Sequence, residues 1–166
     1  MSVPQHELRD AFPPRSLEPE LLADSTGLWT TYPDRRAFEA GCQGRSWDEL
    51  APEFVEEHDD ALRWMNQPAF AAFLPAYLAS LLRGDTSNAL PAMVLLQLTR
   101  REGWEETFDA RAAQLTSTHR AAIVRVLEAL AHGERFSHYR QEIEAALASW
   151  KREVPPRRPT HGADSG

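Results

Sequence analysis

The sequence is short of the residues on which several classes of protein depend. It has one cysteine, Cys42, so it cannot form an internal disulfide bond, which excludes a disulfide-rich secreted scaffold. Its longest apolar run, residues 69–82, is shorter than the roughly 20 residues that a membrane-spanning helix needs. The first fifteen residues contain no apolar signal-peptide core. We therefore expect a cytoplasmic protein that is neither exported nor inserted in a membrane.

Glycine is scarce as well, with eight residues, and none of them belongs to a phosphate-binding loop or a dinucleotide fingerprint. The sequence also contains no nucleophile elbow, zinc-finger spacing or metalloprotease motif. Cys42 lacks a neighbouring base that would activate its thiol, so a small buried residue is the better interpretation of this position. We therefore expect no catalytic residue, no metal ligand and no cofactor.

Histidine and glutamate nevertheless occur at one spacing that suits metal binding. Glu128 with His132, and His138 with Glu142, are i, i+4 pairs on two consecutive expected helices, and such pairs can bind iron, manganese or zinc. A helical wheel places all four on faces opposite the apolar stripes, where ligands cannot close around an ion. One alternative stays open, an enzyme with a metal or acid/base site assembled on adjacent helices from His58, Asp59, His119, His132 and Glu142.

The formal charge of −7 is concentrated in the first third of the chain. Residues 18–60 contain twelve acidic residues and three arginines, whereas acids and bases balance over residues 61–149 and residues 150–166 carry a net +2. An acidic chain opposes attraction to phosphate, so we expect no nucleic-acid binding. The acidic segment predicts instead a protein partner with a basic surface, because opposite charges steer association and fix its register.

Prolines mark both ends of the chain. Six of the twelve lie near the termini, where no hydrophobic period exists to organise a core, namely Pro4, Pro13, Pro14, Pro155, Pro156 and Pro159. The pattern predicts a flexible N-terminal segment over residues 1–15, one helical domain over residues 16–153 and a disordered Pro/Arg tail over residues 154–166.

Helix start and stop signals recur within the expected domain. Ser46 and Glu49 have the spacing of a capping box, in which each residue accepts a hydrogen bond from the backbone of the other. After this turn we expect one helix over residues 53–65. The next helix should begin at Asn66, a good N-cap, and end at Gly84, which can adopt the left-handed conformation that closes a helix.

Pro75 lies inside that second helix and predicts a kink or a break into two short helices. Residues 93–98 are apolar on nearly every side, which is typical of a central, buried helix. Thr116 is expected to begin a helix that ends at Gly133, and an apolar stripe predicts a last helix over residues 136–150. Because no convincing strand pattern is present, the predicted fold is all-α, a compact single-domain bundle of about five to seven helices.

Two aromatic residues and six acidic residues are candidates for contact with the partner. Trp29 and Tyr32 lie in an irregular segment that helix packing explains least, so we expect a surface anchor there. The acidic candidates belong to the acidic segment and lie close together in the sequence: Glu49, Glu53, Glu56, Glu57, Asp59 and Asp60. A solvated acidic face is the simplest interpretation of the acids around His58.

Two further motifs stand in the sequence, Gly44-x-x-Trp47-x-x-Leu50 and Phe70-x-x-Phe73-Leu74-Pro75-Ala76-Tyr77-Leu78. With them, the chain resembles an uncharacterised bacterial family, known only as a domain of unknown function, over residues 38–130. Leu115-Thr116-Ser117 is similar to the start of that family's later helix. The matching positions are structural, so the resemblance implies a shared helical core and carries over no catalytic residue.

Together these observations predict a non-catalytic, cytoplasmic protein-interaction protein. One form of this function is a bacterial immunity-type protein, which neutralises a basic toxin by covering its site. Two alternatives stay open. One is the enzyme described above, and the other is a structural subunit of a homo-oligomer that is sealed by tryptophan and leucine surfaces.

Overall fold

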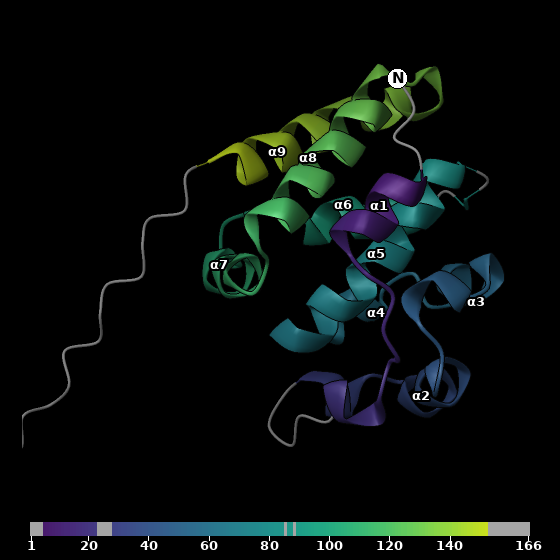
Figure 1. The fold of residues 1–166 in the computed structure, drawn as a ribbon. Coiled ribbons are helices and arrows are strands. Elements are labelled where there is room, and N and C mark those ends of the chain that lie inside the picture. The colour runs from purple at the N-terminus through teal and green to yellow at the C-terminus, as the bar shows by residue number, and fades with distance from the viewer. Residues whose placement is uncertain (1–4, 23–27, 85, 88, 153–166) are drawn as a thin grey trace, which may run out of the picture.

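The computed structural model describes residues 5–22, 28–84, 86–87 and 89–152, and all regular structure in these ranges is helical (Figure 1). The α-helices are α1 (Gln5–Ala11), α2 (Arg35–Cys42), α3 (Pro52–Glu57), α4 (Ala61–Trp64), α5 (Gln67–Arg83), α6 (Ala89–Gln97), α7 (Glu105–Ala113), α8 (Ser117–His132) and α9 (Arg140–Lys151). The short 3-10 helices are η1 (Pro19–Leu21), η2 (Leu28–Thr31), η3 (Trp47–Glu49) and η4 (Glu134–Tyr139). None of these helices has the length and apolarity to cross a membrane.

The all-α class is confirmed, but the described ranges contain nine α-helices, more than the expected five to seven. Residues 53–65 form α3 and α4 instead of one helix, because the backbone leaves the helical conformation at His58, with φ −113° and ψ 43°. The expected flexible segment of residues 1–15 contains α1, whose Leu8 and Ala11 are buried. That expectation is wrong for α1 because its apolar side chains pack against α8 and α5, which lie far along the sequence. Residues 1–4 and the predicted tail lie outside the described ranges.

Helix α5 is the centre of the fold. It begins where the Asn66 side chain accepts a hydrogen bond from the first turn at 2.9 Å, and it ends at Gly84, which has a φ of +76°. It runs through Pro75 as one helix, so of the two expected outcomes, a kink or a break into two helices, the break does not occur. Most of its residues are buried, and it packs against α1, α3, α4, α6, α7 and α8. The central helix is therefore α5 and not residues 93–98, because α6 keeps one side exposed to solvent.

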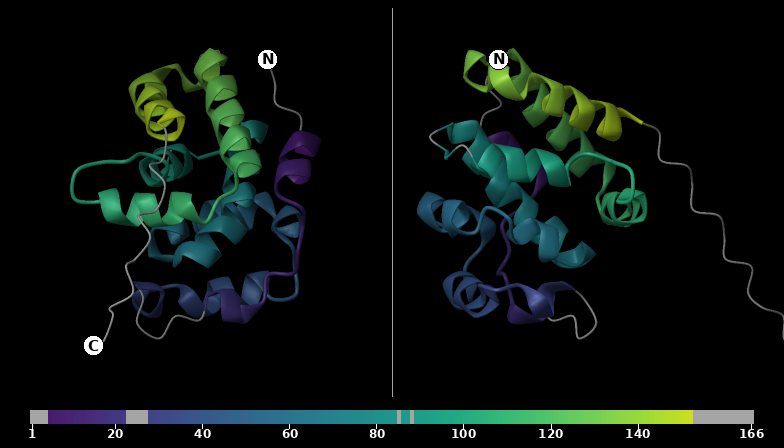
Figure 2. Two further views of the ribbon diagram at one scale, coloured as in Figure 1. Left: turned by 60° about the vertical axis from the view of Figure 1, so that its left-hand side comes forward. Right: turned by 180° about the vertical axis from the view of Figure 1, so that it is seen from behind.

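Helices α8 and α9 lie side by side, and α1 packs against α8 (Figures 1 and 2). The expected start of α8 is confirmed: Thr116 Oγ accepts from the backbone N–H of His119, and His119 Nδ1 accepts from the backbone N–H of Thr116, each at 3.2 Å. Glu7 on α1 and Arg125 on α8 form an ion pair at 3.4 Å. This ion pair joins α1 to α8, near the other end of the described chain.

One buried charge ties α7 to the end of α4. The Arg111 guanidinium donates to the carbonyl groups of Leu62 and Met65 at 2.9 and 3.0 Å, and to the Gln97 side chain at 3.0 Å. It also lies 4.5 Å from the centre of the Phe70 ring. Burial lowers the pKa of Arg111 to about 10, so the group stays charged at neutral pH. Its hydrogen bonds offset the cost of removing that charge from water.

Candidate functional site

The acidic candidates gather on α3 and on the turn that follows it. We call Glu53, Glu56, Glu57, Asp59 and Asp60 the α3 acidic face. Glu53 and Glu57 are exposed, and they stand four residues apart on the same side of the helix, where two like charges repel one another. The other three are half-buried. Eight consecutive residues therefore carry five negative charges on one short stretch of the surface.

The α3 acidic face has hydrogen-bond partners but no cationic partner within the described ranges. Both carboxylate oxygens of Glu56 accept from the backbone N–H of Ser87 at 3.0 Å, and the Asp60 carboxylate accepts from the Trp64 indole at 3.3 Å. None of the five acids forms an ion pair with a described residue. Burial and the neighbouring carboxylates raise the pKa of Asp59. The negative charge of this face is thus not compensated by the surrounding structure.

Glu49 has a local structural role and lies outside the α3 acidic face. Its carboxylate accepts from the backbone N–H of Ser46 at 2.7 Å and from the Ser46 hydroxyl at 3.0 Å. These hydrogen bonds lower the pKa of Glu49, although the side chain is exposed. The expected capping box is confirmed, and it starts the single turn of η3.

Trp29 and Tyr32 are in the core, so the expectation of a surface anchor is wrong. Their exposed fractions are 2% and 4%. The Trp29 indole N–H donates to the Glu39 carboxylate at 2.9 Å, and its ring packs edge-on against Phe38 at 5.2 Å. The Tyr32 hydroxyl lies 3.0 Å from His58 Nδ1. This aromatic pair holds η2 against α2 and α4, and it leaves nothing exposed for a partner to contact.

The histidines of the enzyme alternative lie in separate places. His58 is buried at the end of α3, whereas His119 and His132 stand at opposite ends of α8. The His132 ring forms a hydrogen bond with the Glu128 carbonyl of its own helix at 2.6 Å, and the Glu128 carboxylate forms an ion pair with Lys151 at 2.7 Å. Among the described residues, no group of three or more His, Cys, Asp or Glu side chains is arranged to hold a metal ion.

Cys42 is a buried residue, as its sequence context predicts. Its thiol donates to the Glu39 carbonyl at 3.6 Å. Burial raises the pKa of the Cys42 thiol to about 11, so the group is protonated at neutral pH and is a poor nucleophile.

Sequence reasoning missed a groove of about 580 Å³ that lies beside the chain leaving α1. Its walls are residues 12–15, Leu21, Trp47, the first half of α5, and the junction of α7 and α8 at Gln114 and His119. Two smaller cavities, of about 120 and about 310 Å³, lie elsewhere in the described structure. No local pattern predicts the groove, because its walls meet only after the chain has folded.

His119 joins the wall of the groove to α1. Its ring is stacked on Phe12, with centroids 4.4 Å apart and an angle of 8° between the planes, and it forms a hydrogen bond with the Ala11 carbonyl. Burial lowers the pKa of His119 and nearby Arg15 adds to the effect, while the bond to Ala11 opposes it. The ring is best accommodated in its neutral form, because Nδ1 has to accept the hydrogen bond from the Thr116 backbone.

We expect the free energy of unfolding to decrease as the pH falls through the range in which unfolded His119 titrates. Because the folded pKa lies below the unfolded value of about 6.5, the unfolded state binds the proton first and is favoured as the pH drops. Urea unfolding at about pH 7.5 and about pH 5.5 measures this loss. The variant His119→Gln keeps an acceptor but does not titrate, so it should lose less. An equal loss in both proteins would contradict the assignment.

The described residues thus form a helical fold with an acidic face on α3 and a groove beside α1. The family of unknown function DUF6714 matches residues 9–154, and the chain belongs to this family. The family resemblance of the sequence is thereby confirmed. No curated protein and no solved structure matches the chain.

Proposed function

We propose that this protein is non-catalytic and binds a basic protein partner through the α3 acidic face. The supporting observation is that five acids within eight residues have no ion pair with any described residue. Like charges four residues apart on a helix destabilise the fold slightly. The packing of α3 does not require these charges, because Glu53 and Glu57 are exposed. A cationic surface placed against α3 would offset that cost and would steer the encounter.

The α3 acidic face offers contacts of two kinds. Glu53 and Glu57 are exposed, so ion pairs with them are screened by salt and contribute little each. Asp59 is half-buried, and a partner's arginine placed against it would make a stronger, charge-assisted hydrogen bond. A cation at this position would also lower the pKa of Asp59 back toward its ordinary value. The proposal therefore predicts binding that weakens with salt and with acid.

The test is a comparison of two triple variants that remove the same amount of charge. The tagged full chain captures basic proteins from its host, and the affinity of each purified candidate is then measured for Glu53→Gln/Glu57→Gln/Asp59→Asn. We expect a loss of about 70-fold, from about 0.5 kcal/mol at each of the two exposed glutamates and about 1.5 kcal/mol at the half-buried Asp59, and a smaller loss at high salt.

The matched control removes three exposed acids elsewhere, on the loop before α7, on α7 and on α9, in the variant Glu102→Gln/Glu106→Gln/Glu144→Gln. It should bind within about twofold of the natural chain, because long-range attraction alone is screened at physiological salt. If both triple variants weaken binding equally, the α3 acidic face is not the contact surface. If no candidate shows salt-sensitive affinity, the proposed function fails.

An immunity-type role is the finer form of this proposal, in which the partner is a basic toxin. Co-expression of toxin and chain should then restore growth of the host, and the α3 triple variant should restore it less. The enzyme alternative predicts a stoichiometric amount of metal in elemental analysis. The homo-oligomer alternative predicts that light scattering gives a molecular mass that is a multiple of the mass of one chain. Each result would replace the proposed function with the corresponding alternative.

A further inference from the structure

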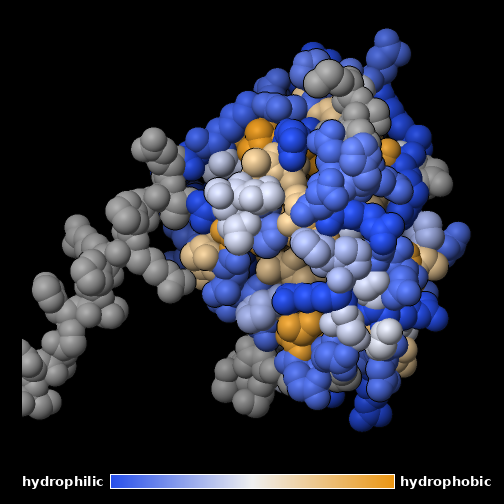
Figure 3. Space-filling model, in the orientation of Figure 1, coloured by the Kyte–Doolittle hydropathy of each residue, from blue (hydrophilic) through white to orange (hydrophobic). Residues whose placement is uncertain are grey.

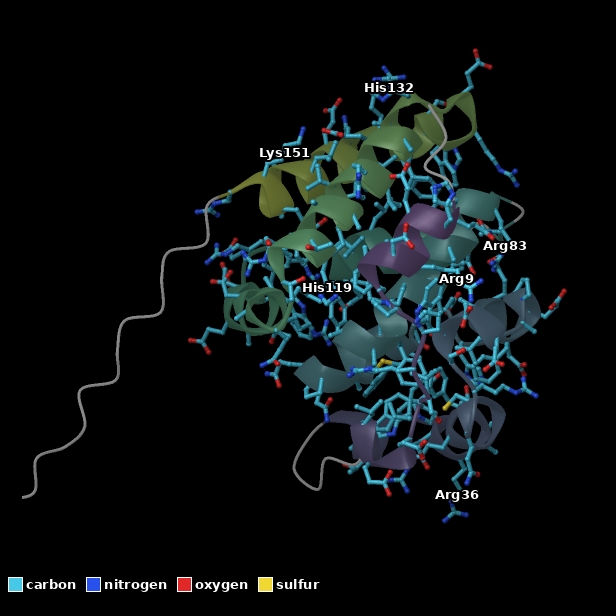
Figure 4. The ribbon with its side chains drawn as sticks, in the orientation of Figure 1. Arg9, Arg36, Arg83, His119, His132 and Lys151 are labelled. Atoms are coloured by element: carbon cyan, nitrogen blue, oxygen red, sulfur yellow. The ribbon has the colours of Figure 1, made fainter. Side chains whose placement is uncertain are left out.

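The groove beside α1 has the volume of a site for a small molecule. Its size of about 580 Å³ lies within the range of about 300–1,000 Å³ that is usual for such sites. The segment of residues 12–17, which we call the strap, leaves α1 along one wall, and α5 forms the wall opposite. His119 is labelled near the centre of Figure 4. In the same orientation, Figure 3 shows tan and pale residues interrupting a largely hydrophilic surface near the centre of this face.

The strap is held at both ends, so the groove does not close by collapse of its outer wall. At one end, the Phe12 carbonyl accepts from the Trp47 indole at 2.9 Å, and the Phe12 ring is stacked on His119. At the other end, the backbone N–H of Leu17 donates to the Arg45 carbonyl at 2.8 Å. Between these anchors, the strap contains two consecutive prolines whose φ angles are fixed by their rings. The wall is therefore preorganised for a ligand.

The lining of the groove is apolar except at its rim. Nine of its twelve lining residues are proline, alanine, leucine or aromatic, and the other three are Arg15, Gln114 and His119. The four lining prolines have no backbone N–H, so few donors face the groove. His119 uses its ring nitrogens for Thr116 and Ala11. Donors for a ligand therefore come from the exposed side chains of Arg15 and Gln114.

Charge selects the class of ligand. No acidic residue lines the groove, although the chain as a whole carries a charge of −7. Arg15 forms no ion pair with a described residue, so its guanidinium is available at the rim. A cation with an apolar body would be repelled by Arg15 and would find no carboxylate to pair with. An anion with an apolar body would pair its charge with Arg15 and place its apolar part against the apolar lining.

We propose that the groove binds an amphipathic organic anion, with its apolar body against Trp47, Pro68 and Pro75 and its anionic group beside Arg15. The proposal is independent of the proposed partner function, because no residue of the α3 acidic face lines the groove. The apolar contacts supply most of the affinity by removing hydrocarbon from water. Arg15 supplies the preference for an anion over a cation of the same shape.

The test uses the full chain labelled with ¹⁵N and three probes with ten-carbon chains, namely decanoate, 1-decanol and decylamine, with the two ionic probes below their critical micelle concentrations and 1-decanol below its solubility limit. The reporter is the indole N–H resonance of Trp47, which lies in the groove wall beside Phe12. We expect decanoate to shift this resonance saturably and to bind about tenfold more tightly than decylamine, since the charge next to Arg15 changes from attraction to repulsion.

Two variants separate the contributions of charge and shape. Arg15→Gln should weaken decanoate binding about two- to fivefold and leave 1-decanol unchanged. The matched control is Arg36→Gln, which removes the same charge from an exposed side chain of α2 at the lower edge of the molecule, away from His119 (Figure 4), and should change the affinity for neither probe. Ala71→Phe places a ring in the groove and should abolish binding of all three probes, with the helical circular dichroism spectrum retained.

Several results would overturn the proposal. They are an unshifted Trp47 resonance, equal affinity for decanoate and decylamine, and full affinity of Arg15→Gln for decanoate. A doubling of the molecular mass that depends on the groove would assign it to a second copy of the chain instead. If Ala71→Phe fails to fold, the comparison of Arg15→Gln with Arg36→Gln still decides the outcome.

Discussion

Replacement of Arg111 by alanine is expected to lower the free energy of unfolding by about 3 to 5 kcal/mol. Arg111 is 3% exposed, and its guanidinium is the donor for the buried carbonyl groups of Leu62 and Met65 and for the Gln97 side chain. Without it, the Met65 carbonyl and the Gln97 side-chain oxygen lose this buried donor, at a cost of about 1 to 3 kcal/mol each, and the Leu62 carbonyl keeps the backbone N–H of Met65 at 3.4 Å. The Phe70 ring also loses the cation stacked on it.

Urea denaturation followed by circular dichroism measures the effect of Arg111→Ala. Arg111→Lys should be intermediate, because a lysine keeps the charge but cannot donate in the same fixed directions. The control is Arg125→Ala, which removes an exposed ion pair with Glu7 and should cost less than about 1 kcal/mol. If Arg111→Ala costs no more than this control, the guanidinium does not hold α7 to α4.

Replacement of Trp29 by alanine is the second large effect, an expected loss of about 3 to 5 kcal/mol. The Trp29 ring is buried between Tyr32 and Phe38, with centroid distances of 5.0 and 5.2 Å. Alanine would leave a cavity and would also leave the Glu39 carboxylate without the indole donor. The result distinguishes a core residue from the surface anchor that the sequence suggests, because loss of an anchor would change binding and not stability.

Trp29→Phe is the matched control for this substitution. It keeps most of the ring volume and removes the hydrogen bond to Glu39, so we expect a smaller loss of about 1 to 2 kcal/mol. Thermal and urea unfolding of the two variants give the comparison. A stable Trp29→Ala variant that has lost only its partner would restore the surface-anchor interpretation and would contradict the packing described for η2.

The helix boundaries that could be predicted are those fixed by local chemistry. Asn66 and Thr116 start helices because their side chains accept hydrogen bonds from the first turn. Gly84 ends one because only glycine adopts a φ of +76° without strain. The local signal of Pro75, in contrast, does not end a helix. Proline lacks the backbone N–H that would donate to the preceding turn, but packing on all sides of α5 holds that helix together. Local signals therefore located the ends of helices better than their interiors.

The features that could not be predicted depend on contacts between distant parts of the chain. In the sequence, α1 has the proline-rich surroundings of a tail, but in the fold it packs against α8 and Leu8 is buried. Trp29 lies in an irregular segment of the sequence, but in the fold η2 packs against α2 and α4 and Trp29 is buried. The groove has the same origin, because Arg15 and His119 are separated by more than half of the sequence and meet only in the fold. The α3 acidic face was the exception. Its charges are adjacent in the sequence, so the pattern alone located them.

The position of α1 has a consequence for synthesis of the chain. Helix α1 leaves the ribosome long before α8, about 100 residues later, which at about 5 to 20 residues per second means a wait of about 5 to 20 s. During that wait Leu8 and Phe12, both buried in the finished fold, lack the part of their covering surface that α8 supplies, although α5 and Trp47 have already been synthesised. The stacking of Phe12 on His119 and the Glu7–Arg125 pair can form only after residue 125 has emerged. Docking of α1 onto α8 is thus a late step in the folding of this chain during its synthesis.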